Sequence, residues 1–252
     1  MCYISVKNLS ITFNKNKLFK DVSFNINKSS LVALTTPSSK GKTTLLNIIN
    51  GNIPCDNILI NNKTISDKTK TKITLITANV NYYSKTVLEE LTLISNNILK
   101  IKKYLKEFKL IDYINMSPYE LNYIQMQKLN LIKALLNKSE IILIDNIFCY
   151  FDKYSKLEYI GLLKKYQIDK GKTIIFTTTN LEDAIFSDKI IIIDKEVLYD
   201  GSIEKIYLND QIIKKSKLNI PLENELLEKL KLYDVIDKVT YTIEEVVDEI
   251  CK

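Results

Sequence analysis

The chain has 252 residues, enough for one substantial hydrophobic core and an added subdomain, and it carries 36 Lys and Arg against 30 Asp and Glu. Every cation is lysine, which codon bias explains, and no basic run alternates with aromatic residues, so the net charge of +6 does not indicate nucleic-acid binding. The four cysteines are scattered without a C-x-x-C pair, which argues against a zinc site or a disulfide scaffold and fits a reducing compartment.

Short apolar runs that alternate with helical patterns predict an α/β domain with a mainly parallel sheet. Residues 3–6 and 22–26 alternate in polarity and predict an early antiparallel part, and no basic-then-apolar leader is visible at the N-terminus. Buried strands are expected at residues 31–34, 73–77, 141–144, 173–177 and 190–193. No run approaches the roughly 18 to 20 apolar residues of a membrane-spanning helix, so we expect a cytosolic protein.

Residues 87–136 have helical spacing and predict a helical insertion, and no strand is predicted after Gly201. Residues 222–232 predict an amphipathic helix, and so does the segment that Thr242 opens with a capping box to Glu245. The expected organisation is a main domain over residues 1–208 with a helical subdomain at about 82–136, and a C-terminal helical extension over residues 209–252.

A phosphate-binding motif follows the predicted strand at residues 31–34. Gly41-Lys42-Thr43 completes the pattern G-x-x-x-x-G-K-[ST], although Thr36 stands where the first glycine belongs. The N-terminus of the helix that follows offers free N–H groups and a positive dipole end to a phosphate. Lys42 would reach the terminal phosphates, and the Thr43 hydroxyl would ligate Mg²⁺.

A second motif is the apolar run at residues 141–144 together with the acid that ends it, Asp145. An Asp in this position could hold Mg²⁺ through water from the far side of the site. Alone it is a weak signal, because many buried strands end in Asp as a turn residue. Together with the first motif it predicts a P-loop nucleotide-binding fold.

These motifs stand in a chain that resembles the ATP-binding cassette (ABC) family over nearly its whole length. The stretch ITFNKNKLFKDVSFNI resembles the family's opening, in which an aromatic residue at the position of Phe13 stacks on adenine. KTVLEEL resembles the segment after the family's glutamine loop, and TTTNLEDAIFSDKIIIID resembles the stretch with its histidine switch. LNYIQMQKLNLIKALLNKSEIILIDNIFCYFD lies at the family's signature and second Asp motif, where the matching residues are Leu121, Gln125, Gln127, Ala134, Leu135, Asp145 and Asp152.

The resemblance implies a RecA-like P-loop NTPase core that binds ATP and Mg²⁺. The implied ATP-binding residues are Phe13, Thr36, Ser38, Ser39, Lys40, Gly41, Lys42, Thr43 and Thr44. The implied Mg²⁺ ligands are Thr43 and Asp145. The signature positions that would face a partner's nucleotide are Asn122, Tyr123, Ile124 and Gln125, and Asp152 falls in the loop that meets the second subunit.

The phosphate loop departs from the family at two glycine positions, which hold Thr36 and Ser39, and Lys40 adds a cation where Ser is usual. Glycine in such a loop permits positive φ and close backbone approach to a phosphate, and both are penalised once a Cβ is present. We therefore expect weaker nucleotide binding than in the family.

Three groups of the family's reaction centre are replaced together. Asn146 stands at the position of the glutamate, and an amide cannot take a proton from the attacking water. Thr179 stands at the position of the γ-phosphate-sensing histidine. Ala78, followed by Asn79, stands at the position of the glutamine. Turnover at this chain's own loop is therefore predicted to be very slow or zero.

The signature is altered as well. Asn122 replaces serine and remains a good N-cap, and Gln125 completes a capping-box pattern with it. Tyr123 and Ile124 replace two glycines, and their bulk should obstruct the close approach of this helix to the partner's nucleotide. We expect the partner's site to be compromised too.

The C-terminal part narrows the resemblance. The stretches YDGSIEKIY and KLNIPLENELLEKLKLYDVIDKVTYTIEEVVDEI are similar to the ATPase subunits of energy-coupling factor transporters. Such machines take up a vitamin or a metal ion, using two ATPase subunits, a transmembrane scaffold and a substrate-binding membrane subunit. The resemblance thus implies a heterodimer with a competent ATPase, located peripherally on the cytoplasmic face of the cell membrane.

Several interpretations remain open at this point. The retained Phe13, Lys42 and Asp145 favour a subunit that binds ATP but hydrolyses it poorly, whereas the missing glycines favour a structural subunit that binds no nucleotide. An active homodimeric ATPase is disfavoured by Asn146 and Thr179. An ATPase subunit of another ABC transporter subclass, such as an exporter, is the alternative if the C-terminal resemblance misleads.

Overall fold

The computed structural model describes residues 2–13, 16–36, 41–65, 72–207, 209–216 and 218. In this part of the chain the strands form a four-stranded antiparallel sheet and a six-stranded, mainly parallel sheet. The antiparallel pairing of the first two strands confirms the predicted early antiparallel part. The smaller sheet has the order β2-β1-β4-β5, with β1 (Cys2–Phe13), β2 (Asn16–Asn27), β4 (Ile58–Ile60) and β5 (Lys63–Thr64).

The larger sheet has the strand order β10-β9-β3-β8-β7-β6. Its strands are β3 (Leu31–Thr35), β6 (Ile73–Thr77), β7 (Ile141–Asp145), β8 (Thr173–Thr177), β9 (Lys189–Asp194) and β10 (Glu196–Gly201). All neighbours pair in parallel except β10, which joins β9 antiparallel. Every residue of β3, β7 and β8 is buried, as the continuous apolar runs predicted.

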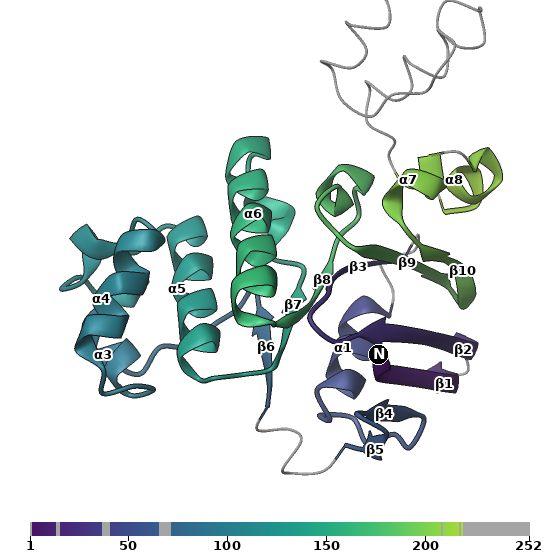
Figure 1. The fold of residues 1–252 in the computed structure, drawn as a ribbon, viewed down its shortest axis with the longest axis horizontal. Coiled ribbons are helices and arrows are strands. Elements are labelled where there is room, and N and C mark those ends of the chain that lie inside the picture. The colour runs from purple at the N-terminus through teal and green to yellow at the C-terminus, as the bar shows by residue number, and fades with distance from the viewer. Residues whose placement is uncertain are drawn as a thin grey trace, which may run out of the picture.

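Side chains of the parallel strands alternate between two cores. Val32 and Leu34 belong to the core shared with α1 (Lys42–Ile49) and the antiparallel sheet. Leu31 and Ala33 belong to the core shared with the remaining helices, including α6 (Lys153–Lys170). This alternation places the sheet between α1 on one side and α6 on the other, as Figure 1 shows.

A helical insertion joins β6 to β7 and confirms the helical pattern of residues 87–136. It lies at the end of the molecule away from the antiparallel strands (Figure 1). Its elements are α3 (Val87–Thr92), α4 (Ile98–Glu107), η1 (Ile111–Tyr113), η2 (Pro118–Glu120) and α5 (Tyr123–Leu136). The later short helices are η3 (Phe148–Tyr150), η4 (Leu181–Ala184), α7 (Ile203–Tyr207) and α8 (Asp210–Ser216). Among the described residues, no helix is long and apolar enough to cross a bilayer.

Three strands were not predicted from the sequence, namely β4, β5 and β10. Both residues of β5 are exposed, and β10 is exposed or half-buried along its length, so neither presents the apolar run of a core strand. β4 has only three residues. The helices predicted at 222–232 and beyond Thr242 lie outside the described residues.

Candidate nucleotide-binding site

The described start of the predicted phosphate-binding motif and the predicted Mg²⁺ acid lie at one edge of the larger sheet. β3 leads into Thr36, β7 ends at Asp145, and β8, which lies between these strands, ends at Thr177. Parallel neighbours place their carboxyl ends at the same edge, and the register aligns Leu34 with Thr177. The topology thus assembles residues that are far apart in the sequence.

Gly41 caps the N-terminus of α1 in a conformation that favours glycine. Its φ is 100°, and a Cβ built there would lie 2.8 Å from Phe19 Cζ. Thr36, at the family's first glycine position, does not have a positive φ, so its Cβ brings no strain of this kind. The glycine that the chain retains is therefore one that the local geometry requires.

The Lys42 side chain is buried at the first residue of α1. Within the described residues, Lys42 Nζ makes no hydrogen bond, and the hydroxyls of Thr35 and Thr36 at the end of β3 also lack partners. Burial lowers the pKa of Lys42, and the Asp145 carboxylate opposes this shift. A buried cation at a helix N-terminus is unfavourable without a counter-ion, so the site fits an anionic ligand.

Asp145 ends β7 with a side chain held in place by its neighbour strand. The residue is only 7 % exposed, and its Oδ1 lies 3.3 Å from the Thr177 hydroxyl. The same hydroxyl accepts a hydrogen bond from the Asn146 backbone N–H at 2.7 Å. Sequence reasoning assigned no role to Thr177; the available signal was a polar residue at the end of a predicted buried strand.

The predicted reaction-centre positions supply no proton acceptor or sensor of the family's kind. Asn146 follows Asp145 directly and is exposed, with a left-handed φ of 51°. Thr179 is exposed beyond the end of β8. Ala78 is half-buried, and its carbonyl accepts a hydrogen bond from Gln127 Nε2 at 3.3 Å.

The signature segment confirms the predicted capping box. Asn122 Oδ1 accepts from the Gln125 N–H, Gln125 Oε1 accepts from the Asn122 N–H, and both distances are 2.9 Å. Ile124 is half-buried, and so is Tyr123, whose ring meets those of Tyr150 and Phe151 edge-on, with centroids 5.0 and 6.0 Å apart. An aromatic cluster therefore lies beside the helix N-terminus, where the family has glycines.

Other predicted site residues are placed less fully. Asp152 is exposed and caps α6, accepting from the Ser155 N–H at 2.9 Å. In α1, Thr43 is exposed and Thr44 is half-buried. The backbone of Phe13 ends β1, but its side chain lies outside the described part of the chain. The residues that are not described at all are Ser38, Ser39 and Lys40.

Comparison with known proteins agrees with this geometry. Residues 19–148 match the family model described as ABC transporter. The energy-coupling factor transporter ATP-binding protein EcfA of Onion yellows phytoplasma (strain OY-M) is 28% identical, over 88% of this chain and 88% of that protein. The spermidine/putrescine import ATP-binding protein PotA of Clostridium novyi (strain NT) is 32% identical, over 81% of this chain and 63% of that protein.

A solved structure supports the fold independently. The structure of cbiO1 from Clostridium perfringens, part of the ABC transporter complex cbiONQ, superposes with a TM-score of 0.77. The two share 19% sequence identity, and the match covers 90% of this chain and 100% of that one. The family match spans more than half of the 252 residues and includes both the phosphate-binding motif and Asp145. The chain therefore belongs to the ABC transporter family, with the family's P-loop NTPase fold.

Proposed function

We propose that this chain is the ATP-binding subunit of an energy-coupling factor transporter, that it binds Mg-ATP at its altered phosphate loop, and that it hydrolyses ATP slowly or not at all. Relatives named as energy-coupling factor ATP-binding proteins support the transporter type. In this proposal a second ABC ATPase subunit with an intact reaction centre performs most of the hydrolysis.

The observation that carries the proposal is the buried Lys42 ammonium, which has no hydrogen-bond partner among the described residues. An ATP phosphate would supply a hydrogen-bonding anion for this cation and would also find the N-terminus of α1. Thr43 and Asp145 would hold Mg²⁺, which would offset the phosphate charge. The oxygen ligands that these two side chains offer are of the type that Mg²⁺ prefers.

Weak hydrolysis follows from the side chains at the predicted reaction-centre positions. Asn146 follows the metal-site acid but cannot act as a general base, and Thr179 cannot reproduce the reach of an imidazole. Tyr123 and its aromatic neighbours occupy space at the signature helix. These features support pairing with a different, competent subunit over pairing with a second copy.

The membrane partners and the cargo are inferred from relatives. We propose a transmembrane scaffold and a substrate-binding membrane subunit as partners, with the chain peripheral on the cytoplasmic face and a vitamin or a metal ion as cargo. Co-purification of an intact ABC ATPase and two membrane proteins with the tagged chain is the expected result. A single polytopic exporter subunit in the eluate would indicate the other ABC subclass instead.

Titration calorimetry with Mg-ATP tests the central claim. The unmodified chain is expected to bind, Lys42→Ala is expected not to, and neither is expected to hydrolyse ATP measurably. The double variant Asn146→Glu with Thr179→His should raise turnover if the loop positions ATP productively. Robust hydrolysis by the unmodified chain that Lys42→Ala abolishes would contradict the proposal and indicate an active ATPase.

A second candidate is a structural subunit that binds no nucleotide. The observation that favours it is Thr36 and Ser39 at two glycine positions of the phosphate loop. This candidate predicts no heat of Mg-ATP binding, together with unchanged assembly of the transporter when Lys42 is replaced by alanine. Binding in the calorimeter would exclude it.

A further inference from the structure

A stripe of polar residues lies on the buried side of α5. We call Gln127, Asn130 and Lys133 the α5 polar stripe; they are spaced three residues apart, which places them on one face of the helix. Gln127 and Asn130 are buried, and the Lys133 side chain is 22% exposed. Buried polar groups need hydrogen-bonding partners. Asn130 Nδ2 donates to Gln127 Oε1 within the stripe, and the other partners described below lie in the connection from β6 to α3 or in α3 itself.

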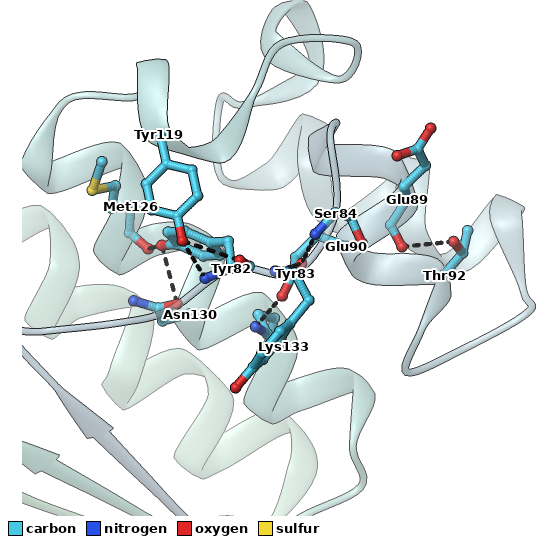
Figure 2. Close-up of polar contacts among 10 residues, drawn as sticks. All are labelled: Tyr82, Tyr83, Ser84, Glu89, Glu90, Thr92, Tyr119, Met126, Asn130 and Lys133. Carbon is cyan, nitrogen blue, oxygen red and sulfur yellow. Dashed lines mark hydrogen bonds and ion pairs between the residues drawn. The ribbon is translucent and has the colours of Figure 1, made fainter.

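The first part of that connection is held at Ala78 and Tyr82. Gln127 Nε2 donates to the Ala78 carbonyl at 3.3 Å. The Tyr82 hydroxyl lies 3.3 Å from both Asn130 Oδ1 and the Met126 carbonyl, as Figure 2 shows. The segment after β6 is thus bonded to α5 at both positions.

The last part is held by a buried ion pair. Glu90, which is 1% exposed, accepts the backbone N–H groups of Tyr83 and Ser84 on Oε2, at 2.9 and 3.1 Å. Its Oε1 lies 2.5 Å from Lys133 Nζ, which also sits 5.3 Å from the centre of the Tyr82 ring (Figure 2). Removing either charge would leave the other buried without its partner.

A second tyrosine, Tyr119, holds the backbone of the segment at Tyr82. The Tyr119 hydroxyl donates to the Tyr82 carbonyl and accepts from the Tyr82 N–H, both at 3.0 Å. The backbone N–H groups of Tyr82, Tyr83 and Ser84 are therefore all bonded to side chains of the helical insertion. By contrast, Tyr83 as a residue is 84% exposed.

We propose that Glu90 and Lys133 are positioning residues that tie the segment Ala78–Ser84 to α5, so that the segment moves with α5 and does not respond to the ligand at Lys42. The side chain of Ala78 is a methyl group, which has no hydrogen-bonding atom to offer to a ligand at Lys42. The independence of the segment from the ligand rests on the proposed function, because it assumes that a nucleotide binds at Lys42. The attachment of the segment to α5 through Glu90 and Lys133 requires no nucleotide.

The chain contains no tryptophan, so Tyr83→Trp introduces a single tryptophan at an exposed position, and its fluorescence can be excited selectively beside the tyrosines. In the full chain, Glu90→Gln and Lys133→Met should each lower the fluorescence anisotropy of Trp at position 83. Their combination should lower it no further, because both remove one shared interaction. Lys133→Arg, which keeps the cation, should restore most of the signal.

Lys128→Met is the matched control. Lys128 also lies on α5 with a buried side chain, but it pairs with Glu158 of α6 at 2.7 Å and not with the segment. It should lower stability without changing the reporter. Equal effects of Lys128→Met and Lys133→Met, or no effect of Glu90→Gln, would overturn the proposal.

Amide hydrogen exchange provides a second measurement that needs no reporter. The N–H groups of Tyr83 and Ser84 should exchange about tenfold faster in Glu90→Gln, the factor expected when each loses its charge-assisted hydrogen bond. The Tyr82 N–H, which donates to the Tyr119 hydroxyl, should change less. Saturating Mg-ATP should change neither exchange nor anisotropy in this segment. An ATP effect as large as that of Lys133→Met would overturn the independence from ligand. Absence of ATP binding in calorimetry would instead refute the proposed function. The anisotropy of Glu90→Gln and Lys133→Met would still test whether these residues hold the segment on α5.

Discussion

Two buried polar clusters of this protein differ in whether their groups have partners. Around Lys42, the ammonium and the hydroxyls of Thr35 and Thr36 have none within the described residues. Around Glu90, both carboxylate oxygens and the backbone N–H groups that face them are bonded. Unsatisfied buried groups that gather at a phosphate-binding motif favour a ligand there, whereas the satisfied groups around Glu90 favour a structural role. The same kind of chemistry thus serves two different purposes in one chain.

Glu90→Ala should have the largest effect, because it leaves the Lys133 cation and two N–H groups without their partner. We expect the free energy of unfolding to fall by about 3 kcal/mol, measured by urea denaturation. Glu89→Ala is the control: its carboxylate is exposed and, within the described residues, accepts from the Lys85 N–H alone, at 3.1 Å, so the loss should stay under about 1 kcal/mol. Similar losses in the free energy of unfolding for the two variants would show that the contacts of Glu90 do not stabilise the fold more than an exposed carboxylate does.

Gly41→Ala should have the next largest effect. The new methyl would lie 2.8 Å from Phe19 Cζ in a backbone with positive φ, so we expect a loss of about 2 kcal/mol. Gly161→Ala is the matched control, since a Cβ there meets nothing within 4 Å in the middle of α6. It should stabilise the protein by up to about 1 kcal/mol. Urea midpoints of the two variants should therefore move in opposite directions.

Lys42→Met should raise the stability of the ligand-free protein, whereas most substitutions of buried residues lower it. It removes from a helix N-terminus a buried cation that has no hydrogen-bond partner in the described part of the chain, so the ligand-free protein should gain about 1 kcal/mol while Mg-ATP binding is lost. Thermal unfolding with and without Mg-ATP measures both effects at once. A destabilised Lys42→Met chain would mean that Lys42 has a structural partner and that the contrast between the clusters is wrong.

Acid should produce the smallest and most gradual change. Burial alone would raise the pKa of Glu90, but the Lys133 ion pair and the two N–H donors outweigh it and leave the pKa below its ordinary value of 4.5. Because the folded-state pKa is lowered, the stability from Glu90 is fully present above that ordinary value and is lost as pH falls through the folded-state value. Urea midpoints measured from about pH 7 to about pH 3 should fall less steeply for Glu90→Gln than for the unmodified chain.

Much of the fold could be predicted because its central strands are continuous apolar runs. The strands at 31–34, 141–144 and 173–177 were found because burial on both faces leaves no polar alternation. The capping box of Asn122 was predicted because it is local, with both partners three residues apart. β10 was missed because it lies at a sheet edge and is partly exposed.

The polar clusters were harder to predict because their partners are distant in the sequence. Nothing near Glu90 shows that it is buried; its cation, Lys133, lies on another helix. Thr177 was interpreted only as a strand residue, although its hydroxyl contacts Asp145. Lys42 and Asp145 were identified because their motifs combine residue type with position, Lys42 at the start of the helix after a strand and loop, and Asp145 at the end of a strand. Their burial, and the absence of a partner for Lys42 Nζ in the described residues, required the structure.

The left-handed backbone of Asn146 bears on the proposed Asn146→Glu substitution. Asparagine tolerates a φ of 51° better than most residues, whereas a glutamate at this position would carry about 1 kcal/mol of additional strain. The substitution is therefore expected to lower stability through the backbone, whatever the new carboxylate does to turnover.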